Sequence, residues 1–328
     1  MIPIIDMHAD VLMDLARNSA TNGPSKENSL IEKFSNHVAR MRKGRISAAV
    51  VVDCRMAGES AGEEHLQMFI DIVQMLKHHE GAEYQFVRNA SELEKAMQSG
   101  LWAGIACFEG LTATGGNLKW LQQLYDQAEM RIASLTHNYD NMFGGGALGQ
   151  DKSLGLTSLG REAVSTMNEL GILIDMAHAS PVTRRDIIEH SNKPVMLSHT
   201  SSKSVYDNGR NLSDSEMKLI AEHGGLIGCM TSPAALADIK DFKHHSLQRY
   251  MEHLLHMINV AGEDHVGLGL HFCEYLYTEE EYPPVTGLED ASVAYRIIDE
   301  LFYAGLSERV IEKIAWRNFM NIFSEACG

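Results

Sequence analysis

Short, continuous runs of apolar residues recur along this chain, and segments with a helical pattern separate them. There are eight such runs, at 2–6, 46–53, 103–108, 132–135, 171–177, 194–198, 224–230 and 265–270. Most of them do not alternate apolar and polar residues, which is typical of parallel strands covered on both faces. Apolar residues at three- and four-residue spacing predict helices at 62–79, 118–129, 159–170, 182–190 and 213–223. Eight strand–helix repeats predict an α/β fold, a TIM-type (β/α)8 barrel.

The length of 328 residues allows two average domains or one large barrel. The chain has no Pro/Ser-rich linker, low-complexity tract or internal repeat beyond the strand–helix rhythm. We therefore expect one (β/α)8 domain over residues 1–328. The region between the second and third strands is the least defined part of this prediction, and an extra hairpin is one possibility there.

Charge and composition exclude several classes of partner. The formal net charge of −16 argues against nucleic acid or an anionic membrane surface as the main partner. The longest apolar runs have the length of strands, far short of the roughly 20 residues that span a bilayer. Five scattered cysteines form no CxxC pair, which indicates reduced thiols. With no basic-apolar leader before the first strand, these features predict a cytoplasmic protein.

Polar residues that can bind metal follow several of the predicted strands. In a barrel of this kind the reactive groups gather at the C-terminal ends of the strands. The residues at these ends are His8 and Asp10, Glu109, His137, Asp175 and His178, His199, and His271. Each histidine alone is more simply read as a hydrogen-bonded residue at a strand–loop junction. Five of the 16 histidines lie at these ends, however, and together they predict a site.

Imidazole nitrogens and carboxylates are ligands that suit zinc and similar divalent ions. His8 and Asp10 are two residues apart, so in a strand their side chains leave on the same face. Two histidine pairs with a shared carboxylate would hold two ions about 3.5–4 Å apart. For Asp175, orienting a ligand or forming a salt bridge is at least as good an interpretation as direct ligation.

The ordered series DMHAD, FEG, LTHN, IDMAHAS, LSHTSS and HVGLGLHF resembles the membrane (renal) dipeptidase family of the amidohydrolase superfamily. The resemblance extends from about residue 4 to RNFMNIF at 317–323. It implies a zinc-dependent dipeptidase that hydrolyses an amide bond with a metal-bridging hydroxide, and often a homodimer. We see no exposed stripe that could be assigned to a dimer interface.

The resemblance also implies a role for each matching position. His8 and Asp10 would bind the first Zn²⁺, and His178 and His199 the second. Glu109 would bridge the two ions. His137 would stabilise the oxyanion at the scissile carbonyl. Arg210, in DNGRN, would bind the terminal carboxylate of the substrate, a task that suits a guanidinium fork.

One position departs from the family pattern. Members usually carry GSDF after the eighth strand, and this chain has GLHF; FDG likewise becomes FCE. His271 thus replaces the aspartate that accepts a proton from the bridging water and helps to hold the amino group of the substrate. An imidazole can act as a general base near neutral pH, or it can bind a metal itself. Glu274 is close enough in sequence to reach back and supply a negative charge.

Three functions follow from these observations. The first is a binuclear zinc hydrolase that acts on dipeptides. The second is a superfamily hydrolase with another small substrate, such as an N-acyl amino acid or a lactone, which the change at His271 favours. The third is a metal-binding homologue with little turnover. The glycine-rich stretch 142–160 lacks the spacing of a phosphate-binding loop and is better interpreted as a mobile lid or substrate loop.

Overall fold

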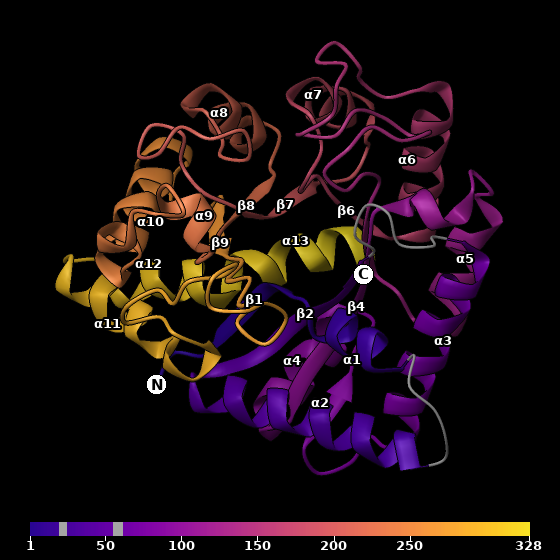
Figure 1. Cartoon of the computed structure of the whole chain (residues 1–328), viewed down its shortest axis with the longest axis horizontal. Helices are drawn as coiled ribbons and strands as arrows, with labels where there is room; N and C mark the ends of the chain where they lie inside the picture. Colours follow the sequence, from indigo (N-terminus) through magenta and orange to yellow (C-terminus); the bar gives the residue numbers. More distant parts are fainter. Residues whose placement is uncertain (20–24, 55–61) are drawn as a thin grey trace.

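The computed structural model describes residues 1–19, 25–54 and 62–328. Its parallel strands form a closed barrel with helices outside it, as the eight apolar runs predict (Figure 1). The strands are β1 (Ile4–Ala9), β2 (Ile46–Cys54), β3 (Tyr84–Phe86), β4 (Trp102–Glu109), β5 (Ile132–Ser134), β6 (Leu173–Asp175), β7 (Val195–Thr200), β8 (Leu226–Cys229) and β9 (Val266–Leu268). The β1–β9 and β2–β4 pairings close the barrel. Each predicted strand is present, with ends that differ by at most three residues.

The region between the second and third predicted strands contains an extra strand, β3. Residue Ala103 of β4 pairs with Ala48 of β2 on one side and with Gln85 of β3 on the other. The strands of a hairpin are antiparallel, whereas β3 runs parallel to β4, so the extra hairpin considered from the sequence is not formed by β3 and β4. It lies beside the first half of β4, and β5 pairs with the second half, from Cys107 onward. The barrel itself therefore has eight strands.

Several of the helices begin at a side chain that caps the first turn. They are α1 (Val11–Ser19), α2 (Ser25–Lys43), α3 (Glu63–His78), α4 (Ala90–Ser99), α5 (Lys119–Gln127), α6 (Ser158–Leu170), α7 (Pro181–His190), α8 (Asp214–Glu222), α9 (Pro233–Leu236), α10 (Leu247–Ala261), α11 (Tyr295–Tyr303), α12 (Glu308–Glu312) and α13 (Asn318–Cys327). A capping box of Ser213 and Glu216 starts α8, and Thr157 caps α6. The predicted helices correspond to α3, α5, α6, α7 and α8.

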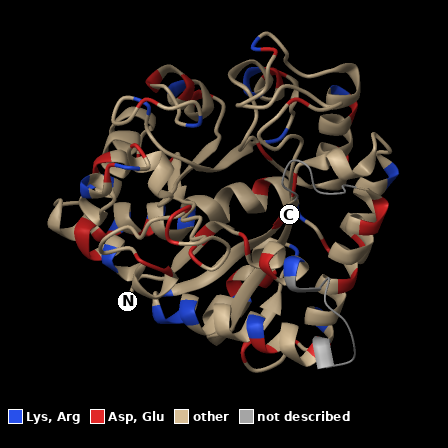
Figure 2. Cartoon of the chain, in the orientation of Figure 1, with Lys and Arg blue, Asp and Glu red and all other residues tan. Residues whose placement is uncertain are grey.

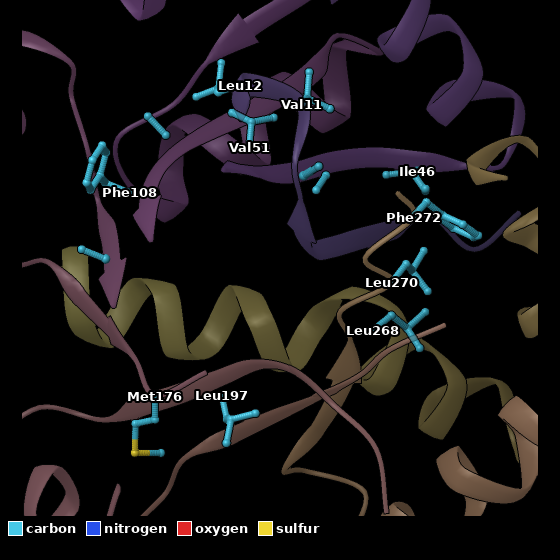
Figure 3. Close-up of a cluster of buried hydrophobic side chains, with 14 of the residues drawn as sticks. Val11, Leu12, Ile46, Val51, Phe108, Met176, Leu197, Leu268, Leu270 and Phe272 are labelled. Atoms are coloured by element: carbon cyan, nitrogen blue, oxygen red, sulfur yellow. The ribbon is translucent and has the colours of Figure 1, made fainter. Parts of the chain in front are cut away.

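Two apolar clusters hold the barrel together. The larger lies between the strands and the surrounding helices, and Figure 3 shows part of it, with Val51, Phe108, Leu197 and Leu268 on different strands. The smaller fills the barrel interior and continues into α13 through Phe319 and Phe323. Helix α13 is fastened to the start of β9 by the Asn318 side-chain amide, which donates to Val266 O at 2.9 Å. It thus covers the N-terminal ends of the strands and leaves the opposite end for the polar residues.

Candidate active site

The predicted site residues lie together at the C-terminal end of the barrel. His8 lies in β1 and Asp10 directly follows it, Glu109 ends β4, His199 lies in β7, and the remaining histidines follow β5, β6 and β9. His8, Asp10, Glu109, His178 and His199 are all less than 7% exposed. Residues that are up to 191 positions apart thus share one buried site because parallel strands end at one rim.

The backbone is irregular at four of the site histidines. The β1–β2 register shifts between Asp6 and Ala9, around His8, and the β7–β8 register shifts between Leu197 and Thr200, around His199. His178 and His271 have φ angles of 66° and 54°, in the left-handed region that non-glycine residues rarely adopt. Bulges and left-handed residues redirect side chains and concentrate at functional sites. Strand alternation alone therefore does not set where these imidazoles point.

His8, Asp10 and Glu109 form the first group of potential ligands, with ligand atoms within 4.8 Å of one another. Nε2 of His8 lies 3.3 Å from Oδ1 of Asp10. Burial disfavours both charges, but their mutual attraction prevails: it raises the pKa of His8 to about 9 and lowers the pKa of Asp10 to about 2. A cation that binds here must replace the proton on His8.

Glu109, His178 and His199 form the second group. Nε2 of His178 and Nε2 of His199 are 3.0 Å apart, and burial holds the pKa of both imidazoles well below the usual range. Both rings are therefore neutral, with a lone pair available. Oε1 of Glu109 lies 3.2 Å from Nε2 of His178 but is buried without a hydrogen bond. An unsatisfied buried carboxylate oxygen facing two imidazole nitrogens fits a divalent cation.

Side chains that the sequence analysis did not single out orient these imidazoles. Oδ1 of Asn138 lies 2.8 Å from Nδ1 of His178 and accepts a hydrogen bond from Arg210 at 2.8 Å. The hydroxyl of Ser198 lies 2.9 Å from Nδ1 of His199. Partners of this kind on Nδ1 leave Nε2 free to bind a metal. Asn138 directly follows His137, and Ser198 directly precedes His199. This position next to a predicted site histidine is the only sequence signal that could have indicated either residue.

His137 and Arg210 lie on the rim of this site. The ring of His137 stacks on His178 with centroids 4.2 Å apart, and its Nε2 is 3.8 Å from Oε2 of Glu109. Arg210 extends from the loop after β7, and its guanidinium reaches within 3.2 Å of Nε2 of His199. Burial lowers the pKa of Arg210 to about 10, so it remains charged at neutral pH. The guanidinium of Arg210 and the imidazole of His137 thus face the second ligand group.

His271 adjoins the first group from the other side. Its Nε2 lies 3.5 Å from Oδ2 of Asp10, and its ring stacks on His199 with centroids 4.7 Å apart. Burial lowers its pKa to about 4, so the imidazole is neutral near pH 7. Gly269 makes this approach possible, because a Cβ there would collide with Ser198 O. Cys273, which the sequence analysis assigned only to the reduced thiols, lies beside it.

The hydrogen-bond partners of Glu274 and Asp175 lie outside the two ligand groups. Glu274 does not reach back into the site: its carboxylate accepts a hydrogen bond from Arg40 at 2.7 Å. Oδ1 of Asp175 accepts from the backbone N–H groups of Ala177 and Ser198, both at 2.9 Å. Asp175 thus connects the ends of β6 and β7, and its role in orienting a metal ligand stays a prediction.

The glycine-rich stretch 142–160 is hydrogen-bonded to the turn that carries His178. Ala147 N–H donates to His178 O at 2.7 Å, and Gly145 N–H donates to Thr183 Oγ1 at 3.0 Å. Asp140 organises the same stretch by accepting from the backbone of Gly146 at 3.0 Å. The loop therefore lies beside the turn that carries His178, and its role as a substrate loop stays a prediction.

Comparison with known proteins places the chain in a family. The profile of the membrane dipeptidase family, peptidase family M19, matches residues 1–327. The chain belongs to this family. An uncharacterized dipeptidase of Schizosaccharomyces pombe is 27% identical over 98% of this chain and 80% of its own length. The predicted resemblance is thus confirmed, and the chain is a member of a metallopeptidase family of hydrolases.

Solved structures of metallopeptidases share the fold. A metallopeptidase described as dipeptidase AC superposes with a TM-score of 0.85 at 22% identity, over 100% of this chain and 99% of that one. A metallopeptidase from Rhodobacter sphaeroides, liganded with a phosphinate mimic of the dipeptide L-Ala-D-Ala, gives 0.84 at 21% identity over 99% of both chains. At this identity the likeness establishes the TIM-type barrel.

Within residues 1–19, 25–54 and 62–328, no helix is both long and apolar enough to cross a bilayer. Figure 2 shows Lys and Arg interspersed with Asp and Glu along the outer helices.

Proposed function

We propose that this protein is a binuclear zinc dipeptidase. His8 and Asp10 would hold one ion, His178 and His199 the other, and Glu109 would contact both. The observation that carries the proposal is the position of Glu109 in both ligand groups, with a buried oxygen that makes no hydrogen bond. Zinc ions bound there would polarise the scissile carbonyl and lower the pKa of water.

The side chains around the ligands fit the binding of a dipeptide. Arg210 would pair with the terminal carboxylate, which orients the substrate with its amide over the ligand groups. His137 would donate a hydrogen bond to the carbonyl oxygen as negative charge develops on it. His271 would accept a proton at a ring nitrogen and return it to the leaving amine. Its neutral state near pH 7 supports the first of these two steps.

The experiment is to replace His8 with Ala and to measure zinc per chain and the hydrolysis of dipeptides, including L-Ala-D-Ala. We expect the variant to lose the zinc of the first group and to lose turnover by orders of magnitude. His223→Ala, at an exposed position after α8, is the matched control and should retain both. Unchanged activity of His8→Ala would remove the proposal.

A second candidate is hydrolysis of a small N-acyl amino acid in place of a dipeptide. It is favoured by His271, since a neutral imidazole offers no negative charge to a free α-ammonium group. A panel of free-amine dipeptides and their N-blocked equivalents separates the two candidates. If dipeptides are the substrates, His271→Asp should maintain or raise their hydrolysis. A large loss in that variant would mean that the histidine has a task of its own.

A further inference from the structure

Beside the two ligand groups lies a third, and it contains a thiol. Asp10, His271 and Cys273 have ligand atoms within 4.8 Å of one another. Sγ of Cys273 lies 3.1 Å from Oδ2 of Asp10 and 3.4 Å from Nδ1 of His271. Nε2 of His271 lies 3.5 Å from the same Oδ2. We propose that Asp10, His271 and Cys273 form an additional binding position for a soft divalent cation such as zinc.

The separations suit a tetrahedral ion. Zinc bonds of about 2.3 Å to sulfur and 2.0–2.2 Å to nitrogen or oxygen place neighbouring ligand atoms about 3.3–3.6 Å apart. With Nε2 of His271 as the ligand atom, the three separations are 3.1, 3.5 and 4.0 Å, so the Sγ–Nε2 pair must shorten by about 0.4 Å to reach this range. A thiolate, an imidazole and a carboxylate are also a ligand combination that favours zinc over magnesium or calcium.

Asp10 can serve this position and the first ligand group together because its two oxygens face different ways. Oδ1 lies against Nε2 of His8, whereas Oδ2 lies against Cys273 and His271. The additional cation would therefore adjoin the first zinc position through a shared carboxylate. Four protein ligands are not needed, since water can complete the coordination.

The backbone fixes the two new ligands before any ion binds. His271 adopts a left-handed φ of 54°, with its N–H donating to His8 O at 3.1 Å and its carbonyl accepting from the Tyr282 hydroxyl at 3.0 Å. Phe272 packs into the apolar cluster outside the barrel (Figure 3). His271 and Cys273, on either side of it, both lie beside Asp10.

Ion binding here is a proton exchange. The cation forms bonds to Sγ, to a ring nitrogen of His271 and to Oδ2 of Asp10. The Sγ–H bond breaks, and its proton is released to solvent. Nothing is oxidised, and no co-reactant is needed. The strained backbone at His271 agrees with a functional constraint on this residue.

Cobalt(II) is the probe that tests the proposal, because a thiolate ligand gives it a charge-transfer band in the near ultraviolet. The metal-free full-length protein is titrated with Co²⁺ under reducing conditions, and bound equivalents are counted by equilibrium dialysis. We expect the wild type to show the thiolate band and Cys273→Ala to lack it. The wild type should also bind one more equivalent of Co²⁺ than Cys273→Ala. Cys273→Ser, which preserves the shape of the side chain, should also lack the band. His271→Asn should weaken this equivalent at least tenfold.

Two other buried thiols serve as controls. Cys229→Ala should retain the band and all equivalents, because Cys229 packs in the apolar cluster between barrel and helices. Cys54→Ala should do so too, although Cys54 lies within ligand range of Glu109 and His137. No thiolate band at saturating Co²⁺, a band that depends on Cys54, or an unchanged number of equivalents in Cys273→Ala would each overturn the proposal. An imidazole that binds this cation has no lone pair left to accept a proton, so occupancy of this position should inhibit the hydrolysis in which His271 is proposed to act. Dipeptide hydrolysis by the protein with two zinc ions is a separate readout, so either proposal can fail alone.

Discussion

At the scale of single residues, Asn138 is where a predicted ligand and a predicted substrate-binding residue meet. Its Oδ1 is 2.8 Å from both Nδ1 of His178 and Nη1 of Arg210. Nδ1 of His178 also lies 2.8 Å from Nη1 of Arg210. A cation on Nε2 of His178 requires a proton on Nδ1, which Asn138 can accept in a hydrogen bond and Arg210 cannot, so a bound cation favours the Asn138 contact. The same amide fixes the guanidinium in the loop after β7. One side chain therefore connects the position of the proposed metal ligand with that of the substrate anchor.

The proposed role of Arg210 predicts a selective loss on its replacement by Lys. The charge is retained, but the two-pronged geometry that matches a carboxylate is lost. We expect KM for dipeptides to rise by about 10- to 100-fold, equivalent to about 1.4–2.8 kcal/mol, with a smaller change in kcat. Steady-state kinetics on a dipeptide and on its C-terminal amide check this. Equal losses on both substrates would contradict it, and the exposed Arg161→Lys is the control.

A second residue-scale prediction concerns His253 on α10, which is fully buried. Its Nδ1 accepts from Ser202 N–H at 3.0 Å, and burial lowers its pKa to about 4. Because an unfolded histidine titrates near 6.5, the unfolded chain binds more protons between pH 6.5 and 4. His253 therefore contributes full stability above pH 6.5, and this contribution falls as the pH drops toward 4, by at most about 1.4 kcal/mol per pH unit.

His253→Asn provides the test of that titration. The amide oxygen can accept the Ser202 hydrogen bond but does not titrate. The free energy of unfolding, measured with denaturant at several pH values, should fall less steeply below pH 6.5 in the variant than in the wild type. Parallel curves for the two proteins would show that His253 does not titrate on unfolding.

At the scale of elements, one carboxylate in the loop between β5 and α6 accepts three backbone hydrogen bonds. Asp140 accepts from the backbone N–H groups of Gly146, Gln150 and Asp151 at 2.9–3.2 Å. The same loop bonds to His178 through Ala147. The order of this loop and the placement of His178 thus depend on the same few hydrogen bonds.

We expect Asp140→Ala to increase amide hydrogen exchange over residues 146–151 and to reduce kcat/KM at least tenfold, since three backbone donors lose their acceptor. Amides of the barrel strands should exchange as before. Asp151→Ala is the control: its carboxylate is exposed and accepts from Ser153 N–H at 2.9 Å, within the same turn. Unchanged exchange in Asp140→Ala would contradict the role assigned to this carboxylate.

At the scale of the whole molecule, metal binding and stability should be linked. A cation that binds the folded site and not the unfolded chain adds about 2.7 kcal/mol at 100 times its Kd. We expect chelation to lower Tm on the order of 5 °C, and zinc, but not magnesium, to restore it. Calorimetry should give one transition if residues 1–328 form one domain, as predicted. An unchanged Tm after verified metal removal would contradict the linkage.

The barrel and the residues of its rim could be predicted from the sequence, because both depend on local patterns. Continuous apolar runs report burial on both faces, and parallel strands bring every residue at their C-terminal ends to one rim. His8, Glu109 and His199 could be grouped in this way without any knowledge of distances. The family resemblance, which rests on the order of these motifs along the chain, implied a role for each residue.

Only the tertiary structure decided which side chains meet within that rim. The sequence predicted that Glu274 could reach back into the site. In the structure its carboxylate instead accepts a hydrogen bond from Arg40, 234 positions away. The approach of Cys273 to Asp10, across 263 positions, follows from barrel closure and from the left-handed backbone at His271. Periodicity carries no information on either, because it records how deeply a residue is buried and not which distant residue it is buried against.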